Sequence, residues 1–238
     1  MDHVKAIIFD CDGTLVDSEH AHYTSWRTAL QKQGRDFSVE EYYCYVGRPT
    51  EVIAKALSQI IGKECAQQLV KDKLASFFSL QSKGLPPIRH TVDFMHRLIK
   101  EKERFNLKLG LASAACKEEI YAHLTSLGIR HLFDVILSGQ DDLEEYQDVE
   151  GVNKPKPYVY LHAAKLLNVM PSECVVIEDS CSGVTAGSSA GCITIAVPNS
   201  YSKAQDFSLA DFKIESFAGM DVEMFLNRVK ELLVSRTH

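Results

Sequence analysis

The stretch FDCDGTLVDS, residues 9–18, places three aspartates within eight positions, at the end of the apolar run AIIF, residues 6–9. Asp10 and Asp12 flank a single cysteine, and Gly13 permits a sharp turn directly after them. Carboxylates this close repel one another, and burial beside a hydrophobic strand strengthens the repulsion. Protonation or a hard cation relieves it, so this stretch predicts a chemically active strand end.

The apolar run also predicts the first strand of a parallel sheet. Val4–Phe9 is predominantly apolar without alternation, as in a strand buried on both faces. Similar runs recur at Leu107–Ala112, Val135–Leu137, Cys174–Ile177 and Cys192–Val197. Helical patterns follow at Lys117–Ser126, Pro157–Leu167, Ser182–Ala190 and Asp221–Leu233. Alternating strands and helices predict an α/β fold, a doubly wound, Rossmann-like parallel sheet with ligands at the carboxyl ends of its strands.

A helical insertion separates the first two predicted strands. About 90 residues intervene, which is too long for a loop. Helices are expected at Asp17–Gln33, Glu40–Val46, Thr50–Ile61 and Glu64–Leu80. Gly and Pro interrupt the helical pattern near Gly84–Pro87, and the opposite hinge is expected near Val16–Ser18. We therefore expect a core domain of residues 1–16 and 88–238 and a small helical domain of residues 17–87 over the carboxyl ends.

The composition and charge of the chain argue against nucleic-acid binding and against a membrane-spanning protein. The 238 residues carry a formal net charge of -6 without a Lys/Arg cluster, so nucleic acid is not an expected partner. No apolar run approaches the length of a membrane span. Seven cysteines, an odd number without C-x-x-C spacing, predict reduced thiols in a cytoplasmic protein. The acidic segment 141–150 is expected to be a solvated, mobile loop with self-repelling charge.

A second acidic pair suggests how the first is neutralised. Glu178 and Asp179 end the apolar run in VVIEDS. Because neighbouring parallel strands end at the same edge of the sheet, they and the Asp10–Asp12 pair are expected to converge there. Oxygen ligands from several carboxylates suit Mg²⁺, which commonly takes up substrate phosphate as well.

Other strand-end residues provide hydrogen-bond donors and positive charge for such a phosphate. Ser113 follows the run Leu107–Ala112, and the backbone amides of Ala114 and Ala115 open the next helix. In NKPKP, residues 153–157, prolines stiffen the backbone around Lys154. One lysine there would offset the charge of a nucleophile and a phosphate.

The four pieces FDCDGTLVDS, LASAA, NKPKP and VVIEDS resemble, in order and form, the four motifs of the haloacid dehalogenase superfamily. The resemblance spans essentially the whole chain and includes a helical cap inserted after the first motif. The sequence looks most like the beta-phosphoglucomutase-like branch of sugar-phosphate enzymes. It therefore implies phosphoryl transfer, and the aspartate at position 12 favours phosphate-ester chemistry over dehalogenation.

The resemblance also implies a role for each matching residue. Asp10 attacks phosphorus and forms an aspartyl phosphate, while Asp12 protonates the leaving oxygen and then activates water. Ser113 and Lys154 hold the transferring phosphoryl oxygens, and the resemblance assigns Lys156 no role. The implied Mg²⁺ ligands are Asp10, the backbone carbonyl of Asp12, Asp179 and Glu178.

Residues of the cap are expected to contact the substrate, together with the amide of Ala114. His22 matches a histidine that positions the acid/base aspartate in the mutase branch; the alternative is an ordinary helix-surface histidine. Arg48 falls in a turn that resembles the specificity loop, and it could bind a second phosphate or sugar hydroxyls. Trp26 is expected in the cap core. The remaining histidines are interpreted as helix or loop residues: His20, His90, His96, His123, His131 and His162.

The sequence therefore predicts a Mg²⁺-dependent phosphatase acting on a small phosphorylated metabolite, a sugar or sugar-alcohol phosphate, as a monomer or weak homodimer. The alternative is a mutase that returns the phosphoryl group to a second sugar hydroxyl. The phosphate-binding arginine of the mutase would align nearer Thr50 than Arg48, which favours the phosphatase. A non-enzymatic binding protein is disfavoured because both Asp10 and Asp12 are present.

Overall fold

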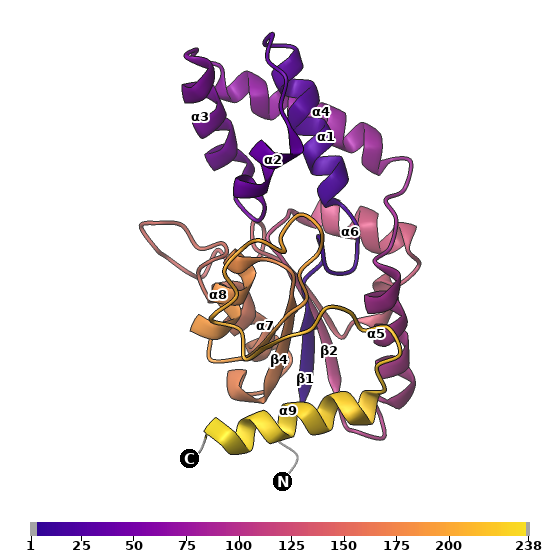
Figure 1. Ribbon diagram of the computed structural model, residues 1–238. Coiled ribbons are helices and arrows are strands. Elements are labelled where there is room, and N and C mark those ends of the chain that lie inside the picture. Colours follow the sequence, from indigo (N-terminus) through magenta and orange to yellow (C-terminus); the bar gives the residue numbers. More distant parts are fainter. Residues whose placement is uncertain (1–3, 237–238) are drawn as a thin grey trace.

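A parallel sheet forms the centre of the molecule (Figure 1). The computed structural model describes residues 4–236, and within them six parallel strands run in the order β3-β2-β1-β4-β5-β6. Their bounds are β1 Ala6–Phe9, β2 Lys108–Ser113, β3 Val135–Ser138, β4 Cys174–Glu178, β5 Ile193–Ala196 and β6 Phe212–Lys213. The doubly wound α/β fold is confirmed, and only the short β6 was absent from the strands expected in this described part.

Both faces of the central strand are buried, as its unbroken apolar sequence predicts. Ile7 and Phe9 belong to the apolar cluster on one face, and Ala6 and Ile8 belong to the cluster on the other. Successive side chains of a strand point to opposite faces, so an apolar residue is needed at every position. The chain can therefore leave the core only after Phe9, where Asp10 begins the loop.

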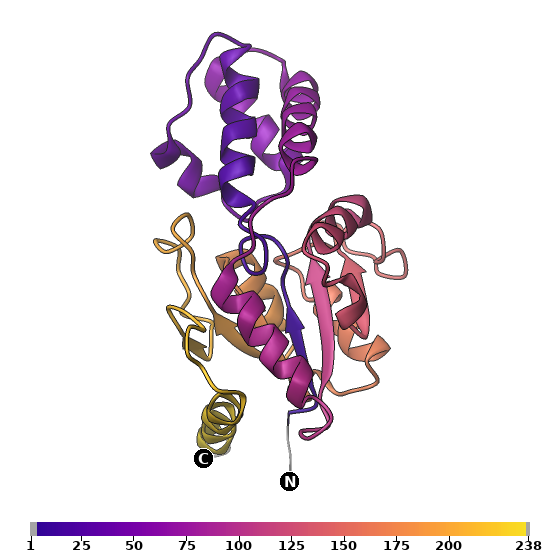
Figure 2. The ribbon, with the colours of Figure 1, turned by 90° about the vertical axis from the view of Figure 1, so that its right-hand side faces the viewer.

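Helices cover the two faces of the sheet (Figures 1 and 2). The cluster with Phe9 is completed by α5 Arg89–Glu101, α6 Lys117–Ser126 and α9 Val222–Arg236. The other face is covered by α7 Tyr158–Leu166 and α8 Cys181–Ser189, and short 3₁₀ turns η2 Arg130–Leu132 and η3 Pro171–Glu173 precede β3 and β4. Helix α5 was not among the expected elements, although Phe94, Met95 and Leu98 give it a buried face.

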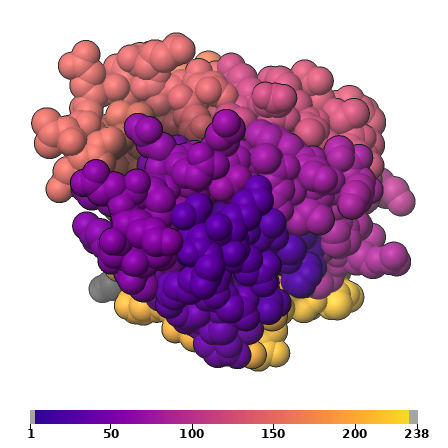
Figure 3. Space-filling view, turned by 90° about the horizontal axis from the view of Figure 1, so that it is seen from above, coloured from indigo at the N-terminus to yellow at the C-terminus, as the bar shows by residue number. Residues whose placement is uncertain are grey.

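The inserted helical cap stands over the carboxyl ends of the strands (Figures 1 and 2). It contains α1 Glu19–Gln31, α2 Val39–Tyr42, the 3₁₀ turn η1 Tyr43–Tyr45, α3 Thr50–Ile61 and α4 Ala66–Gln81. The cap has its own apolar cluster, in which Trp26 is buried as expected. Seen from above, the cap residues cover the middle of this side of the molecule (Figure 3).

Two neighbouring segments join the cap to the sheet. Val16 and Pro87 form an antiparallel bridge, and the Asp17 amide donates to the Pro86 carbonyl at 2.8 Å. The amide of Ile88 donates to the carbonyl of Leu15 at 2.8 Å. Both crossings therefore lie side by side near the predicted hinges, and the domain limits at residues 17 and 87 remain a prediction.

The acidic segment 141–150 was expected to be a loop whose charges repel one another, but several of its charges are paired in the structure. Its carboxylates pair with lysines that neighbouring parts of the chain present. Asp142 pairs with Lys117, and Lys156 lies 3.3 Å from Asp148 and 2.5 Å from Glu150. The sequence pattern could not show these partners, because they lie outside the acidic run.

Two further observations bear on the expected partners and chemistry. No helix in residues 4–236 is long and apolar enough to cross a bilayer. All seven cysteines lie within that range and are free, three of them buried in the sheet region: Cys11, Cys174 and Cys192.

Candidate active site

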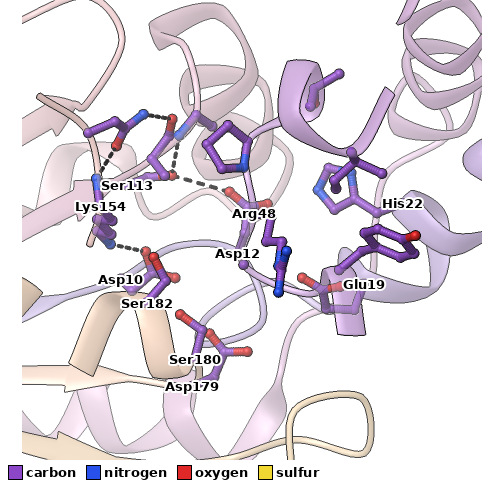
Figure 4. Close-up of a pocket in the computed structure, with 18 of the residues that line it drawn as sticks. Asp10, Asp12, Glu19, His22, Arg48, Ser113, Lys154, Asp179, Ser180 and Ser182 are labelled. Atoms are coloured by element: carbon purple, nitrogen blue, oxygen red, sulfur yellow. Dashed lines mark hydrogen bonds and ion pairs between the residues drawn. The ribbon is translucent and has the colours of Figure 1, made fainter. Parts of the chain in front are cut away.

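Carboxylates from two adjacent strands meet at one edge of the sheet (Figure 4). Phe9 and Ile177 are register partners in β1 and β4, and the Asp10 amide donates to the Ile177 carbonyl at 3.0 Å. The strand ends therefore bring Asp10 beside Glu178 and Asp179. One oxygen of each of these three side chains lies within 4.8 Å of the other two, and all three residues are buried.

Lys154 provides the positive charge inside this cluster. Its ammonium donates to Asp10 Oδ1 at 2.6 Å, to Glu178 Oε1 at 2.7 Å and to the Ala112 carbonyl at 2.9 Å. Burial alone would lower the pKa of Lys154, but the two carboxylates outweigh it and raise the pKa. This ammonium is therefore a fixed charge aimed at the end of β1.

One lysine does not balance three carboxylates. Burial, followed by repulsion from neighbouring carboxylates, raises the pKa of Asp10 and of Asp179 well above the ordinary range. When ionised, the three carboxylates and Lys154 leave two negative charges in a buried, oxygen-lined site. A single divalent cation would cancel them, and an all-oxygen donor set suits Mg²⁺, so these residues fit the implied metal.

Both carboxylate oxygens of Glu178 already accept hydrogen bonds from neighbouring side chains. Its Oε1 accepts hydrogen bonds from Lys154 and from the Tyr160 hydroxyl at 2.5 Å, and its Oε2 accepts one from Ser180 Oγ at 3.2 Å. A Cβ at Gly183 would lie 1.8 Å from Oε1, so α8 can pass here only with glycine. Glu178 is thus held as an anchor for Lys154, and its role as a ligand remains a prediction.

The turn after β1 depends on a glycine beside Asp179. Gly13 has φ +77, and a Cβ there would lie 2.3 Å from Asp179 Oδ2. The side-chain amide of Asn199 donates to the same Asp179 oxygen at 2.7 Å. This close approach keeps the acidic loop compact and presses its backbone against Asp179.

Asp12 lies above this cluster, between two donors. Ser113 Oγ donates to Asp12 Oδ2 at 3.2 Å, and His123 Nε2 lies 3.4 Å from Asp12 Oδ1. Burial alone would raise the pKa of Asp12, but the close approach and charge of His123 outweigh it and lower the pKa. Asp12 is the less buried of the two aspartates, as an acid/base group that meets substrate must be.

The turn after β2 is tied to the loop that carries Lys154. Asn153 Nδ2 donates to the Ala114 carbonyl at 2.8 Å, and Gln140 Nε2 donates to it at 3.3 Å. The backbone amide of Ala115 was expected to donate to the phosphate. In the structure it donates to Ser113 Oγ at 3.0 Å instead. That hydrogen bond orients the serine hydroxyl, and the Ala114 amide is left as the predicted backbone contact.

Comparison with known proteins agrees with this geometry. Residues 7–197 match the haloacid dehalogenase-like hydrolase family. The chain belongs to this family. The relatives at 30% identity include the phosphorylated carbohydrates phosphatase of Thermotoga maritima, over 79% of this chain and 82% of the relative, and the fructose-1-phosphate phosphatase YqaB of Escherichia coli, over 78% and 92%.

A solved structure shares the architecture of this protein over nearly the whole chain. The beta-phosphoglucomutase of Clostridium difficile superposes with a TM-score of 0.78 at 25% identity, over 97% of this chain and 99% of that one. The predicted resemblance to the beta-phosphoglucomutase-like branch is confirmed by this likeness.

In this family member, cap residues close the upper side of a cavity of about 140 Å³ whose floor is formed by Asp10 and Lys154. His22 and Arg48, both predicted for substrate binding, line it (Figure 4). The His22 ring stacks on Phe77 at 4.2 Å, and its Nε2 lies 3.8 Å from Glu119. His22 therefore faces the acid/base region, with the Glu119 carboxylate beside it.

The cavity also contains charged groups that the sequence patterns did not indicate. Lys73 on α4 is 2% exposed, and its ammonium lies 4.6 Å above the ring of Phe77. It has no hydrogen-bond or ion-pair partner among the described residues. Glu19 at the start of α1 accepts a hydrogen bond from the Tyr42 hydroxyl at 2.7 Å, and burial raises the pKa of Glu19 to about 7.

Two more site residues come from α6 of the core. Glu119 and His123 are both buried and lie one helical turn apart. The sequence pattern predicts an ordinary helix or loop residue at His123, and the structure corrects this by placing it against Asp12. A detectable signal was present, because the pair follows Ser113 directly on the next helix, which starts at the site edge.

Proposed function

We propose that the protein is a Mg²⁺-dependent phosphatase that hydrolyses a small sugar or sugar-alcohol phosphate through an aspartyl phosphate at Asp10. The observation that carries this proposal is the placement of Asp10 between Lys154 and Asp179 on the floor of a small cavity, with Asp12 above it. The relatives named for phosphorylated carbohydrates and fructose 1-phosphate support the substrate class.

The metal would be held by Asp10, Asp179, the backbone carbonyl of Asp12 and Glu178. Mg²⁺ at this position would neutralise the acidic cluster and polarise the phosphoryl oxygens. Mg²⁺ is proposed because one divalent cation balances the charge of the cluster and because all of the donors are oxygens.

Two displacements at phosphorus account for the reaction. A carboxylate oxygen of Asp10 bonds to phosphorus as the ester P–O bond breaks, and the leaving oxygen takes a proton from Asp12. Asp12 then takes a proton from water as the water oxygen bonds to phosphorus and the Asp10–phosphorus bond breaks. Ser113, Lys154 and the Ala114 amide stabilise the phosphoryl oxygens in both steps.

The first displacement needs a proton on Asp12, and the second needs Asp12 as a carboxylate. Without substrate, Asp12 is a carboxylate, which suits the water-activating step. A phosphate monoester has a second pKa of about 6, so the substrate can arrive as a monoanion that carries a proton. Transfer of that proton to Asp12, and then to the leaving oxygen, balances the first step.

The cap would select the leaving group. Arg48, Lys73, His22 and Glu19 line the upper side of the cavity, where the sugar part of a substrate would lie. Two cations and a carboxylate suit a small molecule with several hydroxyls or a second anionic group. We further propose that residues 17–87 move as the cap and that the protein acts in the cytoplasm as a monomer or weak homodimer.

A panel of sugar and sugar-alcohol phosphates tests the proposal. Phosphate release should require Mg²⁺, stop in EDTA, and fall at least 10³-fold in Asp10→Asn while the protein remains folded. Lys156→Ala, which removes two ion pairs made by a lysine of the same motif, should keep the wild-type rate. Absence of phosphate release from every substrate, p-nitrophenyl phosphate included, would overturn the proposal.

A mutase is the second candidate, because the beta-phosphoglucomutase of Clostridium difficile shares the cap and the sheet. A mutase passes the phosphoryl group from Asp10 to a sugar hydroxyl, whereas a phosphatase passes it to water. Beta-glucose 1-phosphate with a trace of glucose 1,6-bisphosphate separates them. Glucose 6-phosphate without net phosphate release would favour the mutase.

A further inference from the structure

His123 approaches the proposed acid/base residue at the carboxylate oxygen that Ser113 does not contact. Its side chain is buried on α6, and its Nε2 lies 3.4 Å from Asp12 Oδ1. That oxygen is buried and accepts no hydrogen bond of standard geometry from the described residues. The other oxygen, Oδ2, faces Ser113 at 3.2 Å. The two sides of the Asp12 carboxylate are therefore in different surroundings.

The imidazole itself is held in place by groups from the cap and the core. Gln81 Nε2 lies 3.4 Å from His123 Nε2 and donates to the Glu119 carbonyl at 3.1 Å. Phe77 packs edge-on against the ring with centroids 6.3 Å apart. The Glu119 carboxylate lies 3.9 Å from Nε2. A ring restrained in this way can fix the direction of a contact with Asp12.

His22, expected to position this aspartate, has a different neighbour. Its Nε2 lies 3.8 Å from Glu119, whereas the Nε2 of His123 lies 3.4 Å from Asp12 Oδ1. His22 comes from the cap and His123 comes from the core, so His123 approaches Asp12 from the same domain as Asp12 itself.

We infer that His123 is a positioning residue for Asp12: its imidazole lies against Oδ1, with Nε2 3.4 Å from that oxygen, and thereby keeps Oδ2 turned towards the ester oxygen. This inference rests on the proposed function, in which Asp12 transfers the proton. When the Ser113 hydroxyl donates to a phosphoryl oxygen of the substrate, it no longer donates to Asp12 Oδ2. That oxygen is then free to carry the proton to the leaving oxygen. His123 keeps the carboxylate from rotating away at that moment.

The consequence is a selective dependence on the leaving group. A poor leaving group needs its proton in the transition state, whereas p-nitrophenolate leaves with little help. General acid catalysis contributes about 10²–10⁴-fold, and a misplaced acid forfeits part of this. Loss of packing at His123 would instead slow all substrates to a similar extent.

The test uses the full-length enzyme with Mg²⁺ and two probes, p-nitrophenyl phosphate and phenyl phosphate. In His123→Leu, kcat/KM for phenyl phosphate should fall about 10–100-fold, and kcat/KM for p-nitrophenyl phosphate should change less than about 3-fold. His123→Gln keeps an amide donor of similar reach and should restore most of the phenyl phosphate activity. His96→Leu, a change of an exposed histidine on α5, is the matched control.

Equal losses on both probes, or no loss on either, would overturn the inference. If His123→Leu does not fold, as judged by circular dichroism, His123→Asn replaces it, because its shorter amide falls short of Oδ1 and the same comparison with His123→Gln decides. Failure of the wild-type enzyme to hydrolyse either probe would instead contradict the proposed function.

Discussion

Lys154 donates a hydrogen bond of 2.6 Å to Oδ1 of Asp10, and both residues are at most 5% exposed. The lysine comes from the loop before α7 and the aspartate from the end of β1, so this contact joins segments 144 residues apart. It leaves the other Asp10 oxygen available for chemistry. Breaking it would also leave buried carboxylates without their cation.

Removal of that cation should weaken the fold. Lys154→Met leaves Asp10 and Glu178 facing each other in a buried site, which should cost about 3–5 kcal/mol of unfolding free energy. Urea denaturation at pH 7.5 without Mg²⁺ measures it. The double variant Lys154→Met/Glu178→Gln removes one of the two charges and should recover part of the loss. A single-variant loss below about 1 kcal/mol would contradict this account.

Asp179→Asn should separate apo stability from metal binding. The raised pKa of Asp179 comes from burial and from the carboxylates of Asp10 and Glu178, so its neutralisation should raise the melting temperature without Mg²⁺. The same change should reduce the rise in melting temperature that Mg²⁺ produces. Differential scanning fluorimetry over a Mg²⁺ series measures both effects. Asp206→Asn, on an exposed loop, should change neither.

Glu19→Gln should stabilise the protein more at high pH than at low pH. Burial raises the pKa of Glu19 from 4.5 to about 7, so its favourable contribution is complete below pH 4.5 and is lost as the pH rises through 7. Glutamine does not ionise and can still accept the Tyr42 hydrogen bond. The gain over wild type should grow between pH 4.5 and pH 8, by up to about 3 kcal/mol.

Urea denaturation at several pH values measures this gain. Glu64→Gln, at an exposed position of the cap, is the control and should show no comparable trend. A Glu19→Gln gain that is independent of pH would show that the carboxyl group is not held neutral by its surroundings.

Two glycines allow backbone strain to be separated from contact with the site. Gly13 has φ +77 and Gly34 has φ +82, but only the Cβ at Gly13 would meet a neighbour, at 2.3 Å from Asp179. Both alanine variants should lose about 1 kcal/mol of stability from the left-handed conformation. Gly13→Ala should additionally displace Asp179 and reduce Mg²⁺-dependent phosphatase activity by at least about 10-fold, measured with p-nitrophenyl phosphate. Equal activity in the two variants would contradict the close approach.

The parts of the site that follow buried strands were predictable from the sequence. Asp10, Ser113 and Asp179 each come after an apolar run that needs burial on both faces, and parallel register brings such ends together. Lys154 was predictable because prolines surround it in a short loop. The helical cap was predictable from the length of its insertion.

The residues facing these strand ends from helices were not predictable in the same way. Lys73, Glu119 and His123 occupy single positions on helices whose other buried residues are ordinary core positions. Whether such a side chain faces the cavity depends on how α4 and α6 are rotated against the sheet, and that rotation is set by packing across the whole interface. The lysines that pair with segment 141–150 were missed because they lie outside the acidic run and meet it only in the folded chain.

The most direct test of the central proposal is to identify the residue that becomes phosphorylated. In Asp12→Asn, p-nitrophenyl phosphate should still phosphorylate the enzyme, because its leaving group needs little protonation, but the water step should be slow. Rapid quenching, reduction with borohydride and peptide mass spectrometry should then find homoserine at position 10. Phosphate release with no adduct at Asp10, or with an adduct at another residue, would contradict the account.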